Sequence, residues 1–159
     1  MEDDNKIYLF DTTLRDGQQT TGVNFSVSDK MTLAKNLDEL GVDYIEGGWP
    51  GANPTDTEFF QKKINCKNSV LTAFGMTKKT GRSADNDPGL SALLNSNTKA
   101  VCIVGKSWDF HVDVALGISN EENLENISES TKLFVKEKKE FMFDAEHFFD
   151  GFKANPKYT

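Results

Sequence analysis

The stretch IYLFDTTLRDG, residues 7–17, decides the fold because an apolar run ends abruptly in a cluster of polar residues. The apolar run 7–10 is typical of a strand that is buried on both faces, as in a parallel sheet. The polar cluster then lies at the carboxyl end of that strand, where α/β sheets carry their ligands. Asp16 offers hard oxygens for a divalent cation, and Arg15 offers planar donors for a carboxylate or an oxyanion. The stretch therefore predicts a ligand site, and a surface loop with a local Arg–Asp pair is the alternative.

The composition is that of a globular chain. Its 159 residues are 37% hydrophobic and 27% charged, and the net charge of −7 disfavours a general nucleic-acid binder. The sequence predicts no membrane span, and its acidic start, MEDD, differs from a secretory signal, so we expect a cytoplasmic protein. Cys66 and Cys102 lack CxxC spacing, and we expect buried free thiols in preference to a disulfide or a metal site.

Strand-like and helix-like segments alternate along the chain, which is typical of βαβ units. Helix caps are predicted at Ser26 with Asp29, at Asp87, and at Ser119 with Glu122. Within the first helix, residues 27, 31, 34, 37 and 40 follow helical spacing and predict its buried face. The expected strands are residues 7–10, 42–46, 70–74, 100–104 and 140–148, and the expected helices are residues 26–40 and 55–63 and two that begin near 88 and 119.

Two architectures fit this alternation, an open doubly wound sheet and a barrel. A dinucleotide-binding sheet would carry GxGxxG after its first strand, and residues 11–26 lack it. Polar residues instead follow several strands, as the rim of a barrel requires. We therefore predict an α/β fold, a parallel (β/α)8 TIM barrel of which about the first four and a half units are present. Residues 1–159 would be the N-terminal part of one barrel domain that is truncated after strand five, because a full barrel takes about 250 residues.

Four long segments carry a resemblance to a known family: LFDTTLRDGQQTTGVNFS (9–26), LDELGVDYIEGGWPGANPTDTEFF (37–60), VGKSWDFHV (104–112) and DAEHFFDGFKANP (144–156). Together they resemble the citramalate synthase branch of the isopropylmalate, homocitrate and citramalate synthase family. That family belongs to the metal-dependent TIM-barrel enzymes named for their DRE-type motif. The segments EGGWPGANP and DAEHFFDG favour the citramalate branch over the isopropylmalate branch.

The resemblance implies an acyltransferase that joins acetyl-CoA to pyruvate by a Claisen-type condensation, giving citramalate and CoA in isoleucine biosynthesis. It implies a divalent metal ion (Mg²⁺, Mn²⁺ or Zn²⁺) with Asp16 as one ligand, and a homodimer in the full-length protein. Arg15 would stabilise the oxygen of the 2-oxo acid as it gains negative charge. Glu146 matches the catalytic glutamate of the family, either as the base or as a group that orients the base.

Other polar residues are candidates for the substrate site. Glu46 is predicted to hold Arg15 by a salt bridge in the barrel mouth. His147 is expected to point away from Glu146, because neighbours on a strand face opposite sides, and residues 148–149 to lie in the core. The substrate-binding candidates, for which ordinary polar loops and a structural histidine are the alternatives, are Arg15, Gln19, Glu46, Lys106, Ser107 and His111.

We expect residues 1–159 alone to be inactive as a catalyst. The resemblance implies that the remaining metal ligands, a His-x-His pair and a later asparagine, lie on strands beyond Thr159, since neither His111 nor His147 has that spacing. Two alternative functions therefore stay open. One is an acyl-CoA lyase of the same barrel group, and the other is a non-catalytic half-barrel that serves as a binding or assembly module.

Overall fold

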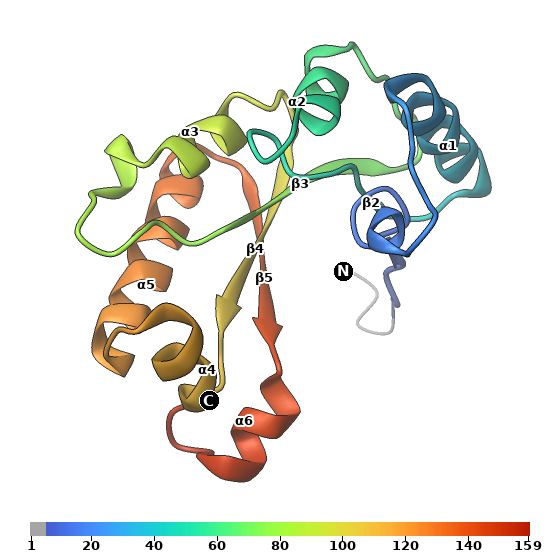
Figure 1. Ribbon diagram of the computed structural model, residues 1–159. Coiled ribbons are helices and arrows are strands. Elements are labelled where there is room, and N and C mark those ends of the chain that lie inside the picture. The colour runs from blue at the N-terminus through green and yellow to red at the C-terminus, as the bar shows by residue number, and fades with distance from the viewer. Residues whose placement is uncertain (1–5) are drawn as a thin grey trace.

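The computed structural model describes residues 6–159, in which five parallel strands form one sheet in the order β1-β2-β3-β4-β5 (Figure 1). Each strand pairs with the next in the chain, and helices make most of the connections, so the sheet is half of a TIM barrel, as predicted. The strands are β1 (Phe10–Asp11), β2 (Tyr44–Glu46), β3 (Val70–Met76), β4 (Ala100–Lys106) and β5 (Glu140–Glu146).

The main helices lie along the outer side of this curled sheet (Figure 1). They are α1 (Val27–Leu40), α2 (Pro54–Gln61), α3 (Pro88–Leu94) and α5 (Asn120–Lys136), and two shorter helices, α4 (Asp109–His111) and α6 (Phe148–Ala154), follow β4 and β5. Short turns of other helix types complete the connections, namely η1 (Gly17–Gln19), η2 (Ala84–Asn86) and the π-helical η3 (Val112–Leu116). No helix among residues 6–159 is long and apolar enough to cross a membrane.

The predicted helix caps are confirmed. Ser26 and Asp29 form a reciprocal capping box at the start of α1, and Ser119 and Glu122 form another at the start of α5. The Asp87 carboxylate accepts the backbone N–H groups of residues 89 and 90 at the start of α3. These caps satisfy amide groups that a helix start would otherwise leave without partners, so each helix begins where its sequence signal lies.

The hydrophobic core lies between the sheet and the outer helices. Phe141 of β5 stacks on Phe134 of α5 with ring centroids 6.2 Å apart, whereas Met142, Phe143 and Asp144 border an inner cavity. Gly75 of β3 allows α3 to pack closely, because a Cβ there would lie 2.5 Å from Leu93. Fully buried core side chains include Leu14, Ile45, Phe59, Leu90, Leu93, Val101, Ile103 and Phe134.

The sheet already curves like a barrel wall at its amino end. The Tyr44 hydroxyl of β2 donates a hydrogen bond of 2.5 Å to Glu140 of β5, although two strands separate them. This contact raises the pKa of Tyr44 to about 12, because the hydrogen bond to Glu140 favours the neutral phenol and burial adds to the effect.

Three expectations about the ends of the chain were wrong. Residues 7–9 do not form a buried strand, since Ile7 is 84% exposed and β1 has a single neighbour in the sheet. The fifth strand ends at Glu146, because His147 adopts a left-handed backbone conformation with φ +55° and starts α6. Phe148 and Phe149 are therefore exposed and not in the core.

Cys66 and Cys102 are free thiols. Cys102 is buried, as expected, and Cys66 is only partly buried.

Candidate functional site

Arg15 is held at the carboxyl ends of β1 and β2 by three neighbours. Its Nε donates to Glu46 at 2.7 Å, which is the predicted ion pair, and its Nη1 donates to Asp16 at 3.2 Å. The Phe74 ring of β3 lies flat beneath the guanidinium, with its centroid 3.9 Å from Cζ. A guanidinium fixed on these sides keeps one orientation, which is what an electrostatic catalyst requires.

Glu46 is the buried partner of this arrangement. Its side chain is 1% exposed, whereas that of Arg15 is 16% exposed. Burial raises the pKa of Glu46, and the hydrogen bond and charge of Arg15 oppose that rise. The ion pair with Arg15 is therefore what allows a carboxylate at this depth.

A cavity of about 350 Å³ borders Arg15 on the inner side of the sheet. Asp144 and Met142 of β5 line it together with Cys102 of β4. Burial, followed by the nearby carboxylates of Glu46 and Asp144, raises the pKa of the Cys102 thiol to about 12. Asp144 is not among the predicted site residues, although period-two alternation along EFMFDAE places it on the same face as Glu146.

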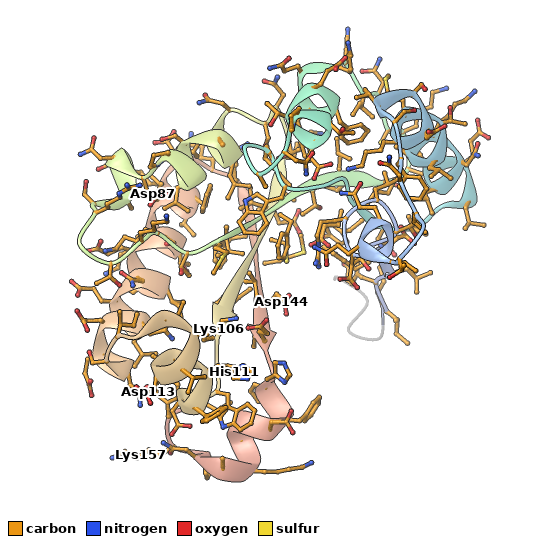
Figure 2. The ribbon with its side chains drawn as sticks, viewed as in Figure 1. Asp87, Lys106, His111, Asp113, Asp144 and Lys157 are labelled. Carbon is orange, nitrogen blue, oxygen red and sulfur yellow. The ribbon has the colours of Figure 1, made fainter. Side chains whose placement is uncertain are left out.

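Glu146 lies at the carboxyl end of β5 and is ion-paired with Lys106 at the end of β4. Ser107 Oγ donates to the backbone oxygen of Glu146 at 2.7 Å. Asn123 of α5 donates to the backbone oxygen of Lys106 at 2.8 Å, and it also donates to the Tyr158 hydroxyl at 2.7 Å. Figure 2 shows Lys106 of β4 and Asp144 of β5 near each other on these two neighbouring strands. Three predicted site residues, Lys106, Ser107 and Glu146, thus form one group.

His111 joins this group through aromatic contacts. Its ring lies 4.7 Å from Trp108 and 4.6 Å from His147, centroid to centroid. The left-handed turn at residue 147 brings His147 to the same rim, where its Nδ1 lies 3.2 Å from Asp150. The expectation that His147 points away from the site was therefore wrong, because this residue lies beyond the end of the strand. His111 appears below Lys106 in Figure 2.

The loop after β1 places its two glutamines differently. Gln18 donates to Asp56 at 3.3 and 3.4 Å, whereas Gln19 is exposed. The Asp16 side chain is 63% exposed and accepts a hydrogen bond from Arg15 alone among residues 6–159. Its outer lone pairs suit a divalent cation. No group of three or more His, Cys, Asp or Glu side chains within the described part of the chain is placed to bind a metal.

A larger pocket, of about 460 Å³, lies between Trp49 and the loop after β3. Trp49 forms one wall, and its ring packs edge-on against Phe74 with centroids 5.6 Å apart. The cations Lys79 and Arg82 of the loop after β3 line the pocket, together with Lys78, which is ion-paired with Glu129, and the Asp87 carboxylate. The apolar lining comprises Trp49, Met76, Pro88, Leu116 and Ile118.

The structure is a half-barrel with polar side chains at the carboxyl ends of its strands, which is the architecture of a TIM-barrel protein. The family model described as HMGL-like matches residues 6–154. The chain belongs to this family. It is 52% identical over 156 residues to the (R)-citramalate synthase of Aquifex aeolicus, a match that covers 97% of this chain and 30% of the relative. It is 45% identical over 159 residues to the (R)-citramalate synthase of Streptomyces coelicolor, covering 98% of this chain and 30% of the relative. The predicted resemblance is therefore confirmed.

The structural comparison gives the same fold. The crystal structure of the HMG-CoA lyase of Bacillus subtilis matches with a TM-score of 0.68 at 19% identity, over 87% of this chain and 45% of that chain. The chain spans about 30% of the length of the curated relatives named above.

Proposed function

We propose that the chain is the N-terminal part of a single TIM-barrel catalytic domain in an acyltransferase that condenses acetyl-CoA with pyruvate. The balanced reaction consumes one water and gives citramalate and CoA. The observation that carries this proposal is the fixed Arg15 guanidinium beside Glu46 and Asp16, in a chain that closely resembles two (R)-citramalate synthases. The cytoplasm, isoleucine biosynthesis and a homodimeric full-length protein belong to the same proposal.

Arg15 is the proposed electrostatic catalyst. Its Nη2 has no hydrogen-bond partner among residues 6–159, so this nitrogen is free to donate to the keto oxygen of pyruvate. As the new carbon–carbon bond forms, that oxygen gains negative charge, which the guanidinium stabilises more strongly than it stabilises the neutral ketone. A divalent metal ion (Mg²⁺, Mn²⁺ or Zn²⁺), bound by Asp16 and by ligands outside the described residues, would supply Lewis-acid polarisation of the same carbonyl group.

Glu146 is the proposed acid–base residue for the acetyl methyl group. It acts either as the base or as the residue that orients the base, and Lys106 and Ser107 fix its position. His111 and Gln19 are proposed to contact the substrate at the rim. Glu46 contributes by holding Arg15, and the Asp144 carboxylate adds negative charge to the inner cavity.

The larger pocket is the proposed site for part of acetyl-CoA. A protein of net charge −7 needs a local excess of cations to bind the anionic phosphates of CoA. Lys79 and Arg82 supply that excess, and Trp49, Met76 and Leu116 offer apolar surface to the pantetheine chain. The Trp49–Phe74 contact brings this pocket next to Arg15.

The experiment that tests this function uses the complete protein that contains this chain. It is incubated with Mg²⁺, pyruvate and acetyl-CoA labelled with ¹³C in the acetyl group, and the products are read by NMR. We expect labelled citramalate. In a parallel incubation with 3-hydroxy-3-methylglutaryl-CoA, cleavage of this thioester together with no citramalate in the first incubation would instead favour a lyase. We expect residues 1–159 by themselves to be inactive in both reactions, because the proposed metal ligands other than Asp16 lie outside them.

A further inference from the structure

Lys30 of α1 and Asp56 of α2 form an ion pair that is sealed from solvent. Their side chains are 0% and 2% exposed, and Lys30 is among the largest fully buried side chains of the protein. Burial lowers the pKa of Lys30, and the hydrogen bond and charge of Asp56 oppose that change. A buried ion pair is a poor source of stability, since apolar residues of similar size are often as good or better. The pair therefore calls for another explanation.

Asp56 binds two loops at once. Its Oδ2 accepts the backbone N–H of Trp49 at 2.8 Å, and both of its carboxylate oxygens accept the side-chain amide of Gln18, at 3.3 and 3.4 Å. Gly48 makes room for this contact: its φ is +143°, and a Cβ there would lie 2.6 Å from Cγ of Asp56. The carboxylate thus joins the loop after β1 to the loop after β2.

Both loops lead to Arg15. Gln18 lies three residues after Arg15 in the first loop. Trp49 of the second loop packs edge-on against Phe74, and Phe74 lies under the guanidinium, 3.9 Å from its Cζ. Lys30 donates a hydrogen bond to this buried carboxylate and supplies its counter-charge, while Asp56 accepts hydrogen bonds from both loops.

We propose that Lys30 and Asp56 are positioning residues, which fix the site through the Gln18 side chain and through the Trp49–Phe74 contact. Neither residue touches the substrate. The inference rests on the proposed condensation, because the consequence of misplacing Arg15 is a slower reaction. A displacement of about 1 Å in such a group costs roughly 100-fold in rate.

The test compares three forms of the complete protein: wild type, the double variant Lys30→Met with Asp56→Leu, and a matched control. The control is Lys35→Gln with Glu39→Gln, an exposed pair on α1 whose charged atoms lie 3.7 Å apart. We expect the double variant to keep its melting temperature within a few degrees and to lose about 10-fold or more in kcat. KM for pyruvate should change less than kcat, and the control should match wild type.

A second readout does not depend on activity. The protein is labelled with 5-fluorotryptophan, and the ¹⁹F resonance of Trp49 is assigned by its loss in Trp49→Phe. We expect this resonance to shift in the double variant and to stay in place in the control. Wild-type kcat together with an unmoved Trp49 resonance in the double variant would overturn the proposal.

If the double variant does not fold, Gln18→Ala tests whether Asp56 positions the site. This substitution removes the side chain that Asp56 binds and leaves the core intact. We expect about 5-fold or more loss of kcat at an unchanged melting temperature, and wild-type kcat would overturn the positioning role. Failure of the proposed function gives a different result. Wild type would then release no CoA from acetyl-CoA and pyruvate, while the Trp49 resonance would still report whether the pair fixes the loop.

Discussion

Lys106 and Glu146 are direct register partners on β4 and β5, and Lys106 Nζ donates a hydrogen bond to Glu146 Oε2. The ion pair lies at the carboxyl end of the sheet, and Ser107, the residue directly after β4, donates a hydrogen bond to the backbone oxygen of Glu146. The orientation of the proposed acid–base carboxylate is therefore set by β4, before any substrate binds.

Replacing Lys106 tests this arrangement. In Lys106→Met, Glu146 loses its partner and its fixed orientation, so kcat should fall by about 100-fold. Lys106→Arg preserves a cation at the same strand end and should recover part of the loss. Steady-state rates of the complete protein measure both, and a Met variant as fast as wild type would remove Lys106 from the site.

Arg15→Lys should slow the reaction severely while leaving the fold intact. An ammonium group is a point charge that cannot donate to Glu46 and Asp16 and stack on Phe74 at the same time. We expect kcat to fall by roughly 100-fold or more, with a melting temperature close to that of wild type. If Arg15→Lys turned over normally, the planar donor geometry would have no role.

Asp16→Asn should weaken metal binding. An amide oxygen is a poorer ligand for a hard cation than a carboxylate, and even the loss of outer-shell partners costs about 10-fold in affinity. Titration of Mn²⁺ by electron paramagnetic resonance measures the change in the complete protein. Asp85→Asn, an exposed substitution on η2, is the control and should bind as wild type does. Equal affinities in both variants would contradict the assignment of Asp16.

Arg82→Glu should raise KM for acetyl-CoA and leave KM for pyruvate unchanged. The substitution places a negative charge at the pocket proposed for CoA, which costs about 5-fold in apparent affinity for an exposed charge. Lys99→Glu changes the total charge equally at the opposite end of β4 and serves as the control. The same rise in KM for both variants would mean that net charge, and not this pocket, matters.

The Tyr44 phenol should lose its proton at a higher pH than an ordinary tyrosine. Its pKa is raised to about 12 from an ordinary value of 10.0, so between these values the folded protein keeps a proton that the unfolded chain releases. The contribution of Tyr44 to stability is therefore complete below pH 10 and is lost as the pH rises through about 12. Tyrosinate absorbance during a pH titration reports the midpoint. Glu140→Gln should bring it back toward 10, and an unmoved midpoint would rule out Glu140 as the cause.

Local signals in the sequence predict the fold well where they act within a few residues. Capping pairs such as Ser26 with Asp29 need no distant partner, and Gly41 ends α1 in the left-handed conformation that only glycine adopts easily. The prediction of a strand at residues 7–9 is wrong, because a strand forms only where its backbone pairs with a neighbouring strand, and the local sequence does not show which strands will be neighbours.

The site was predictable only in part. The ion pair of Arg15 with Glu46 follows from two strand ends that meet at one rim, and this prediction is confirmed. The buried face of α1 was predicted only in part, because Lys30 and Asp38 lie inside with Ala34, whereas Leu40 is 76% exposed. Nothing near Lys30 in sequence distinguishes it from an exposed lysine, since its partner Asp56 lies on another helix.

The most direct test of the central claim is CoA release from acetyl-CoA by the complete protein with Mg²⁺ or Mn²⁺, comparing pyruvate, 2-oxoisovalerate and 2-oxoglutarate. The proposed function predicts rapid release with pyruvate and little with the two larger 2-oxo acids. Release with 2-oxoisovalerate or 2-oxoglutarate but not with pyruvate, or no release with any of the three, would contradict it.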